Sequence, residues 1–413
     1  MSARHDETAK WLAEGLAHHR SGRLEAAAEC YANAGEADPE CSDAPHLLGV
    51  LALQRGRPGD ARALISRAIE MQPRIAEYHG NLARVLRATG DLERAMRAEV
   101  DAYLLRRRHD PPDPNAETYR FTTVAKLRHD VEQLDYLIGL GRAEPAWIEA
   151  RDAFAALSTS LEREARDDVS IALSPARLEA LGGLYNRALH FVEPAPVERA
   201  LHPNLDVPAI ARAYRENAPG VVHFDGLLSD EALRELRRFC LESTIWHDFS
   251  HRGGYLGAYA GDGFDCALLG QIARELRESF AEILGPHPLT QHWAYKYDAT
   301  MSGISLHADL AAVNLNFWIS PDDACTDPEG GGLLVYPVEA PLEWDFAAYN
   351  ADPDRVSRYL DARGARPIRI PHRQNRAVMF DSNLFHRSDA AAFRPGYGNR
   401  RINVTFLFGE RGT

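Results

Sequence analysis

The sequence has no long uninterrupted run of apolar residues. A helix that crosses a bilayer needs roughly 20 of them, and no segment of this chain supplies such a run. The first residues, MSARHDETAKWLAEG, are polar and lack the apolar stretch and small-residue cleavage site of a secretion signal. We therefore expect a cytoplasmic protein that does not associate with membranes.

Cysteine is scarce and scattered. The chain has five cysteines and no CxxC pair. An odd number at these spacings argues against both a disulfide framework and a zinc knuckle. We expect reduced thiols that pack as small apolar side chains.

Positive charge is also in short supply, since the formal net charge is −13. A protein that holds DNA or RNA by its phosphates normally carries a basic surface, so nucleic acid is not expected as a substrate. The hydrophobic fraction of 45% and the charged fraction of 26% are ordinary for a globular protein. A length of 413 residues suggests two or three domains.

A period of 34 residues runs through the N-terminal part of the chain. It relates Gly22, Gly56 and Gly90, and it also relates two sets of alanines, Ala27, Ala61 and Ala95, and Ala34, Ala68 and Ala102. The period predicts stacked helical hairpins, with the glycine in the turn between two helices, where a positive φ is often needed. The alanines share one face of the second helix, and small side chains there let neighbouring helices approach closely.

This pattern resembles the tetratricopeptide repeat. The first unit matches it at Trp11, Gly15, Ala27, Tyr31, Ala34 and Pro39. The second unit keeps Gly49, both alanines and Pro73, and the third keeps Gly90 and both alanines but has Ala83 and Arg107 in place of the first glycine and the proline. The resemblance implies a helical solenoid over residues 1–108 whose concave groove holds a peptide or protein segment. A purely structural role, or formation of a homo-oligomer through the repeats, stays open.

The middle of the chain carries no recognisable chemistry. A proline-rich break, HDPPDPN, occupies residues 109–115, and Glu193-Pro-Ala-Pro196 forms a second break. Apolar residues recur at three- and four-residue steps between these breaks. We expect residues 109–196 to be a helical connector or degenerate repeats, and residues 197–413 to be a separate domain.

The last third of the chain reads as a series of strands that follows two helices. Alternation or short apolar runs mark residues 291–297, 313–319, 330–337, 377–381 and 401–408. The whole chain is therefore predicted as an α+β multidomain protein that ends in a β-sandwich or barrel with flanking helices.

Three residues in this region form a candidate metal site. His307 and Asp309 are two apart, so in extended backbone their side chains point to the same face. His386 follows a separate apolar strand. Two imidazoles and one carboxylate make a facial triad, which leaves half of an octahedral iron ion open. The alternatives are histidines that only satisfy hydrogen bonds in the core, and a cupin-like domain that holds another metal.

The final strand supplies a candidate anion site. Its apolar residues alternate with Arg401, Asn403 and Thr405, which must share the opposite, interior face. A buried cation is costly without an anionic partner. The interpretation that we favour is that Arg401 binds the distal carboxylate of 2-oxoglutarate as a fork, whereas Arg400 points the other way.

The order of these motifs resembles the double-stranded β-helix (jelly-roll) oxygenases, including their prolyl hydroxylase branch, over roughly residues 200–413. The motifs are HxD, a GG-L strand, F-x-x-x-x-x-H and R-x-N-x-T-F. The resemblance implies that His307, Asp309 and His386 hold Fe(II) and that 2-oxoglutarate and O₂ are cosubstrates. It also allows ascorbate as an accessory reductant. It also implies that Tyr297 hydrogen-bonds the cosubstrate and that Asn403 assists Arg401.

The predicted function is hydroxylation of a C–H bond on a peptide or protein side chain held partly by the repeats. The retained Asp309 favours hydroxylation, because halogenating relatives replace this carboxylate with a small residue. The alternatives are a small-molecule hydroxylase of the phytanoyl-CoA hydroxylase type and a catalytically silent scaffold. Two segments are candidates for shaping the entrance, residues 246–259, which are rich in aromatics and glycine, and the insert at 339–366.

Overall fold

The computed structural model describes residues 2–109, 116–217, 219–251, 253–298, 303–390 and 392–412. The chain divides into two compact units, the first formed by the N-terminal helices with Asp265–Ala267 and the second by the remainder. The predicted break at 109–115 lies, apart from His109, outside the described residues. Among the helices that the structure describes, none is both long and apolar enough to cross a membrane.

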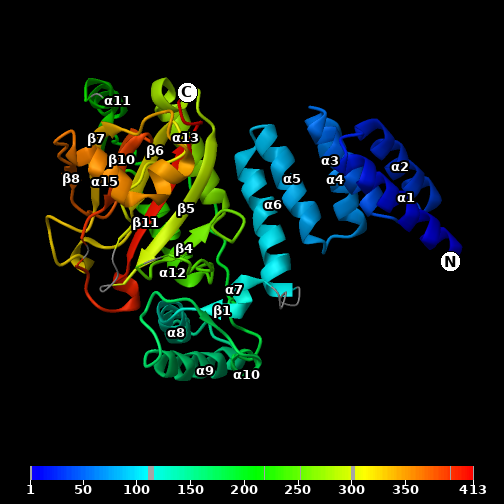
Figure 1. Ribbon diagram of the computed structural model, residues 1–413, viewed down its shortest axis with the longest axis horizontal. Coiled ribbons are helices and arrows are strands. Elements are labelled where there is room, and N and C mark those ends of the chain that lie inside the picture. Colours follow the sequence, from blue (N-terminus) through cyan, green and yellow to red (C-terminus); the bar gives the residue numbers. More distant parts are fainter. Residues whose placement is uncertain are drawn as a thin grey trace. The chain divides into compact units, whose positions relative to one another are not determined.

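The N-terminal unit is a row of helical hairpins (Figure 1). Gly22, Gly56 and Gly90 lie in the turns with φ of 75°, 70° and 80°, a conformation that strongly favours glycine. The six alanines of the 34-residue period are 0% exposed. The prediction of stacked hairpins is therefore confirmed. The helices are α1 (Ser2–Arg20), α2 (Leu24–Ala37), α3 (Asp43–Gln54), α4 (Pro58–Met71), α5 (Ala76–Ala88) and α6 (Leu92–Leu104).

The second unit begins with helices that pack on one another and on the sheet-rich part. Leu134 of α8, with Trp147 and Phe154 of α9, belongs to a buried apolar cluster. The side chain of Gln133 donates to the backbone carbonyls of Leu241 and Ser243 at the end of α12. The helices of this unit are α7 (Glu117–Arg120), α8 (Val124–Gly139), α9 (Pro145–Leu161), α10 (Pro175–Ala180), α11 (Val207–Glu216), α12 (Asp230–Glu242), α13 (Ala267–Ser279), α14 (Ala281–Leu284) and α15 (Pro353–Asp361).

Two antiparallel sheets form the rest of this unit. The larger has the strand order β3-β9-β6-β11-β5-β4 and the smaller has the order β10-β7-β8. A cluster that includes Trp318, Leu333, Ile370 and Val378 joins residues of both sheets in one core. The strands are β3 (Val221–Asp225), β4 (Leu256–Tyr259), β5 (Leu289–Tyr297), β6 (Val313–Trp318), β7 (Leu333–Glu339), β8 (Ile368–Ile370), β9 (Arg376–Asp381), β10 (Leu384–Ser388) and β11 (Arg401–Phe408), and a separate ribbon pairs β1 (Phe121–Thr122) with β2 (Ile171–Ala172).

The structure corrects two details near the predicted metal site. His386 lies inside β10 rather than after a strand. Asp309 lies outside any strand, because its backbone N–H donates to the carbonyl of Ser382 instead of joining a regular ladder. Short strands such as β4, β8 and β10 were not predicted, since three to five residues carry too little alternation to be recognised.

Candidate metal centre

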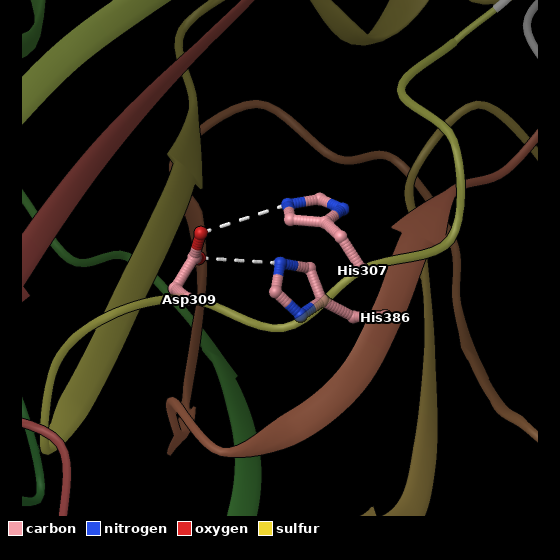
Figure 2. A group of neighbouring side chains, drawn as sticks. All are labelled: His307, Asp309 and His386. Carbon is pink, nitrogen blue, oxygen red and sulfur yellow. Dashed lines mark ion pairs between the residues drawn. The ribbon is translucent and has the colours of Figure 1, made fainter. Parts of the chain in front are cut away.

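The three predicted ligands come from two neighbouring segments. His307 and His386 face each other in an isolated antiparallel bridge, and the backbone N–H of each donates to the carbonyl of the other. Their ring centroids are 4.3 Å apart. Asp309 follows two residues later and turns its carboxylate toward both rings (Figure 2). The structure thus brings the three side chains together.

The ligand atoms of these residues converge on one point. Nε2 of His307 lies 3.6 Å from Oδ1 of Asp309, and Nε2 of His386 lies 3.3 Å from Oδ2 of the same carboxylate (Figure 2). One nitrogen or oxygen from each residue lies within 4.8 Å of the others. A single metal ion could therefore contact all three.

Hydrogen bonds determine which ring nitrogen of each histidine is available. Nδ1 of His307 lies 2.8 Å from the carbonyl oxygen of Ser305, and Nδ1 of His386 lies 3.0 Å from that of Leu384. A carbonyl oxygen only accepts, so each Nδ1 carries the proton and each Nε2 keeps a lone pair. The backbone around each histidine thus leaves its Nε2 available as a possible ligand atom.

Burial sets the charges of the site. Burial, with the neighbouring His386, lowers the pKa of His307 to about 4, which keeps this imidazole neutral near pH 7. Burial alone would raise the pKa of Asp309, but the two histidines and the side chain of Asn314 lower it overall. The donor set therefore includes the neutral imidazole of His307 and the carboxylate of Asp309, which suits a divalent transition metal.

Arg401 lies at the start of β11, on its interior face, and is 2% exposed. Its Nε donates to the carbonyl of Gly331 at 2.7 Å and its Nη2 to that of Gly332 at 3.1 Å. Its Nη1 donates to Oδ1 of Asn403 at 3.2 Å. No carboxylate of a described residue forms an ion pair with it. Arg401 is thus a buried cation whose hydrogen-bond partners are all neutral. An anionic ligand could therefore balance its charge.

The triad and Arg401 share one cavity of about 550 Å³. Asn316, Ser388, Asn403 and Thr405 contribute neutral polar groups to its wall. The remaining wall is mostly aromatic or apolar and includes His251, Tyr255, Tyr259, Trp293, Tyr295, Leu310, Phe346 and Leu407. Both candidate entrance segments contribute, the 246–259 segment through His251, Tyr255 and Tyr259, and the 339–366 insert through Phe346 and Asn350.

Tyr297 and Asn403 occupy different places. Asn403 lines the cavity and accepts from Arg401. Tyr297 is buried beside Arg401, whose guanidinium carbon lies 4.7 Å from its ring centroid, but it does not line the cavity. Its hydroxyl has no hydrogen-bond partner among the described residues. The structure therefore places Tyr297 behind the arginine rather than at the cavity surface.

Asn314 and Asn316 of β6 are residues that sequence reasoning missed. Asn314 donates to Oδ2 of Asp309 at 2.5 Å, and Asn316 lines the cavity. The signal was present, because both asparagines fall on the same parity of a strand whose other residues are apolar. The sequence does not show that β6 pairs with β11, and this pairing places Asn316 opposite Thr405.

Comparison with known proteins identifies the N-terminal region. The sequence profile of the tetratricopeptide repeat matches residues 12–69 and 46–114. Together with the helical hairpins, this match shows that the N-terminal region contains tetratricopeptide repeats. No curated protein matches the sequence.

Several solved structures match part of the chain. The first tetratricopeptide domain of Spaghetti, bound to an HSP90 peptide, is 16% identical, and the match covers 27% of this chain and 82% of that one with a TM-score of 0.24. The TPR2B domain of yeast Sti1 in complex with pHsp70 is 16% identical, and the match covers 24% of this chain and 79% of that one with a TM-score of 0.23. A mutant O-GlcNAc transferase of Thermobaculum terrenum is 28% identical, and the match covers 32% of this chain and 26% of that one with a TM-score of 0.25.

Proposed function

We propose that the sheet-rich part is a double-stranded β-helix domain that acts as an iron(II)- and 2-oxoglutarate-dependent oxygenase and hydroxylates a C–H bond. One observation supports this most strongly. Two imidazoles and a carboxylate with ligand atoms within 4.8 Å share a cavity with Arg401, a buried cation that has no acidic partner among the described residues. A divalent metal fits the first group and a carboxylate fits the second.

The residues suit these two ligands in different ways. His307 and His386 would bind iron through Nε2, and Asp309 would balance part of its charge. Three protein ligands would leave coordination positions for 2-oxoglutarate and O₂. Arg401 would bind the distal carboxylate of 2-oxoglutarate with the guanidinium hydrogens that its neutral partners leave unused. Asn403 would hold the arginine in place through its side-chain carbonyl.

When bound, iron and 2-oxoglutarate supply the oxidation, in which O₂, 2-oxoglutarate and a substrate C–H group give succinate, carbon dioxide and the hydroxylated product. The protein orients the reactants. The aromatic side chains of the cavity, such as Tyr255, Tyr259 and Trp293, would exclude water and position the substrate beside the three metal ligands.

The cavity lining favours an uncharged substrate group. Apart from Asp309 and Arg401, no described lining residue is an aspartate, glutamate, lysine or arginine. Leu310 and Phe346 line the cavity and are 48% and 53% exposed, and exposed apolar side chains beside a site are typical of surfaces that bind another molecule. We propose a peptide or protein substrate, because stacked repeats also offer a concave binding surface.

The direct test is an anaerobic titration of the purified protein with iron(II) and 2-oxoglutarate. We expect a visible charge-transfer band in the wild type and none in His307→Ala, because the variant lacks one of three metal ligands. His251→Ala is the matched control, since it removes a histidine from the same cavity but outside the triad, and it should keep the band.

Two results would overturn the proposal. The first is the absence of a band in the wild-type protein with both ligands present. The second is a band of equal strength in the His307→Ala protein. The unfolding temperature of each variant, measured alongside, separates loss of the site from loss of the fold.

A further inference from the structure

A buried chain of side-chain hydrogen bonds starts at Asp309. Nδ2 of Asn314 lies 2.5 Å from Oδ2 of Asp309, and Nδ2 of Asn316 lies 2.5 Å from Oδ1 of Asn314. The hydroxyl of Thr405 lies 2.6 Å from Oδ1 of Asn316. None of these four residues is more than 6% exposed, and Asp309, Asn316 and Thr405 line the cavity.

The direction of every bond in this chain follows from the carboxylate at its end. An ionised carboxylate only accepts, so Asn314 must turn its amide NH₂ toward Asp309. The carbonyl of Asn314 then faces Asn316, which must donate in turn. The carbonyl of Asn316 therefore faces Thr405, whose hydroxyl donates. Each amide orientation is thus determined by chemistry.

The other end of the chain approaches Arg401. Nη1 of Arg401 donates to Oδ1 of Asn403 at 3.2 Å, and Nδ2 of Asn403 lies 3.5 Å from Oδ1 of Asn316. All donors therefore run from the buried cation toward the buried carboxylate. Successive bonds of one sense polarise and strengthen one another.

We infer that Asn314 and Asn316 are positioning residues for the metal-binding carboxylate, an inference that rests on the proposed function. With Oδ2 bonded to Asn314, the carboxylate of Asp309 is held in one orientation toward the two imidazoles. A carboxylate held in one rotamer loses less conformational freedom when it binds. Partners of metal ligands typically change metal affinity by about 10- to 100-fold when they are lost.

Asn316→Asp tests this inference because it preserves shape but removes the donor. The new carboxylate cannot donate to Oδ1 of Asn314, so Asn314 loses its partner or turns its own carbonyl toward Asp309. We would titrate wild type and variant with Mn(II) and follow the free ion by electron paramagnetic resonance. The Kd for Mn(II) should rise by about 10- to 100-fold.

Asn383→Asp is the matched control. It places the same substitution at another buried asparagine, whose Oδ1 accepts from Arg411 at 2.7 Å and whose role an aspartate can fill. Its affinity for Mn(II) should equal that of the wild type. Thr405→Val provides a second variant if Asn316→Asp does not fold, and its loss of one donor should raise the Kd about fivefold.

The outcomes separate the two ideas. Wild-type protein without saturable Mn(II) binding would overturn the proposed function and, with it, this inference. Wild-type protein that binds Mn(II), together with folded Asn316→Asp and Thr405→Val proteins of unchanged affinity, would overturn this inference alone. Thermal unfolding of each protein shows which variants are folded.

Discussion

At the scale of single residues, the candidate site depends on which atoms the protein itself already engages. Nδ1 of His307 and of His386 faces a backbone carbonyl, which leaves Nε2 for a metal. Arg401 donates hydrogen bonds to two glycine carbonyls and to the side-chain oxygen of Asn403. It forms no ion pair with a carboxylate of a described residue. The site is therefore arranged before any ligand arrives, which lowers the cost of binding.

Removal of the Arg401 charge should lower the affinity for 2-oxoglutarate without lowering the stability of the fold. Arg401→Met should weaken 2-oxoglutarate binding by at least about 30-fold, because the distal carboxylate loses its charged partner. Affinity for Mn(II) should fall by a much smaller factor, because Arg401 acts on Asp309 only through the hydrogen-bond chain. The unfolding temperature should stay level or rise, since the desolvation cost of a buried cation disappears. Titration of the charge-transfer band and thermal unfolding measure the two effects.

Arg400→Met is the control for this substitution. Arg400 precedes Arg401 but pairs with Glu132, with Nε 2.8 Å from Oε2. Its loss should lower the unfolding temperature and leave 2-oxoglutarate affinity unchanged. Equal loss of 2-oxoglutarate affinity in both variants would contradict the assignment of Arg401.

At the scale of elements, the segment that leads into β4 forms part of the cavity wall. The His251 ring stacks on Tyr255 with centroids 4.4 Å apart. The hydroxyl of Tyr259 lies 2.7 Å from that of Tyr295 in β5. Asp248 forms a bridge with Gly257 of β4 and lies 3.0 Å from Nε2 of His251. The wall is thus held to the sheet by polar contacts as well as by aromatic packing.

The Asp248 carboxyl should make the stability of this wall depend on pH. Burial alone would raise its pKa, but the hydrogen bond and charge of His251, with the Ser250 N–H, lower it to about 2. Since this value is below that of the unfolded chain, the stabilisation is present above about pH 4 and is lost as the pH falls toward about 2.

Asp248→Asn should reveal this contribution. At pH 6 the variant should have a free energy of unfolding lower by about 1–2 kcal/mol. The difference from wild type should shrink toward zero between about pH 4 and pH 2. Denaturant unfolding at several pH values measures it, and a difference that does not change with pH would contradict the role given to this ion pair.

At the scale of the whole molecule, two units carry different chemistry. Tetratricopeptide repeats form the first unit, and every residue that lines the candidate cavity belongs to the second. A free small molecule would need only the cavity.

A protein substrate should be detectable directly in a mixture of cellular proteins. If the proposed function holds, then after incubation of lysate proteins with the wild-type protein, iron(II) and 2-oxoglutarate, mass spectrometry should find peptides that gain the mass of one oxygen atom. The His307→Ala protein is the matched control and should produce none. Succinate release that depends only on the small-molecule fraction of the lysate would instead support the alternative small-molecule function.

Much of the architecture follows from periodicity in the sequence. The 34-residue step predicted the hairpins and their turn glycines, because each repeat unit packs in the same way as the previous one. Strand parity predicted that Arg401, Asn403 and Thr405 would share an interior face, and all three line the cavity. The short strands and the irregular backbone at Asp309 were not predicted, because neither has a repeated pattern of apolar residues in the sequence.

Sequence alone determined which residue types stand at which parity, and hence the candidate ligands His307, Asp309, His386 and Arg401. Only the tertiary structure decided how these candidates are connected. The pairing of β6 with β11 brings Asn316 to Thr405, and the bridge between His307 and His386 joins segments far apart in the chain. Such contacts depend on strand order and register, which arise from packing of the whole sheet and not from any local pattern.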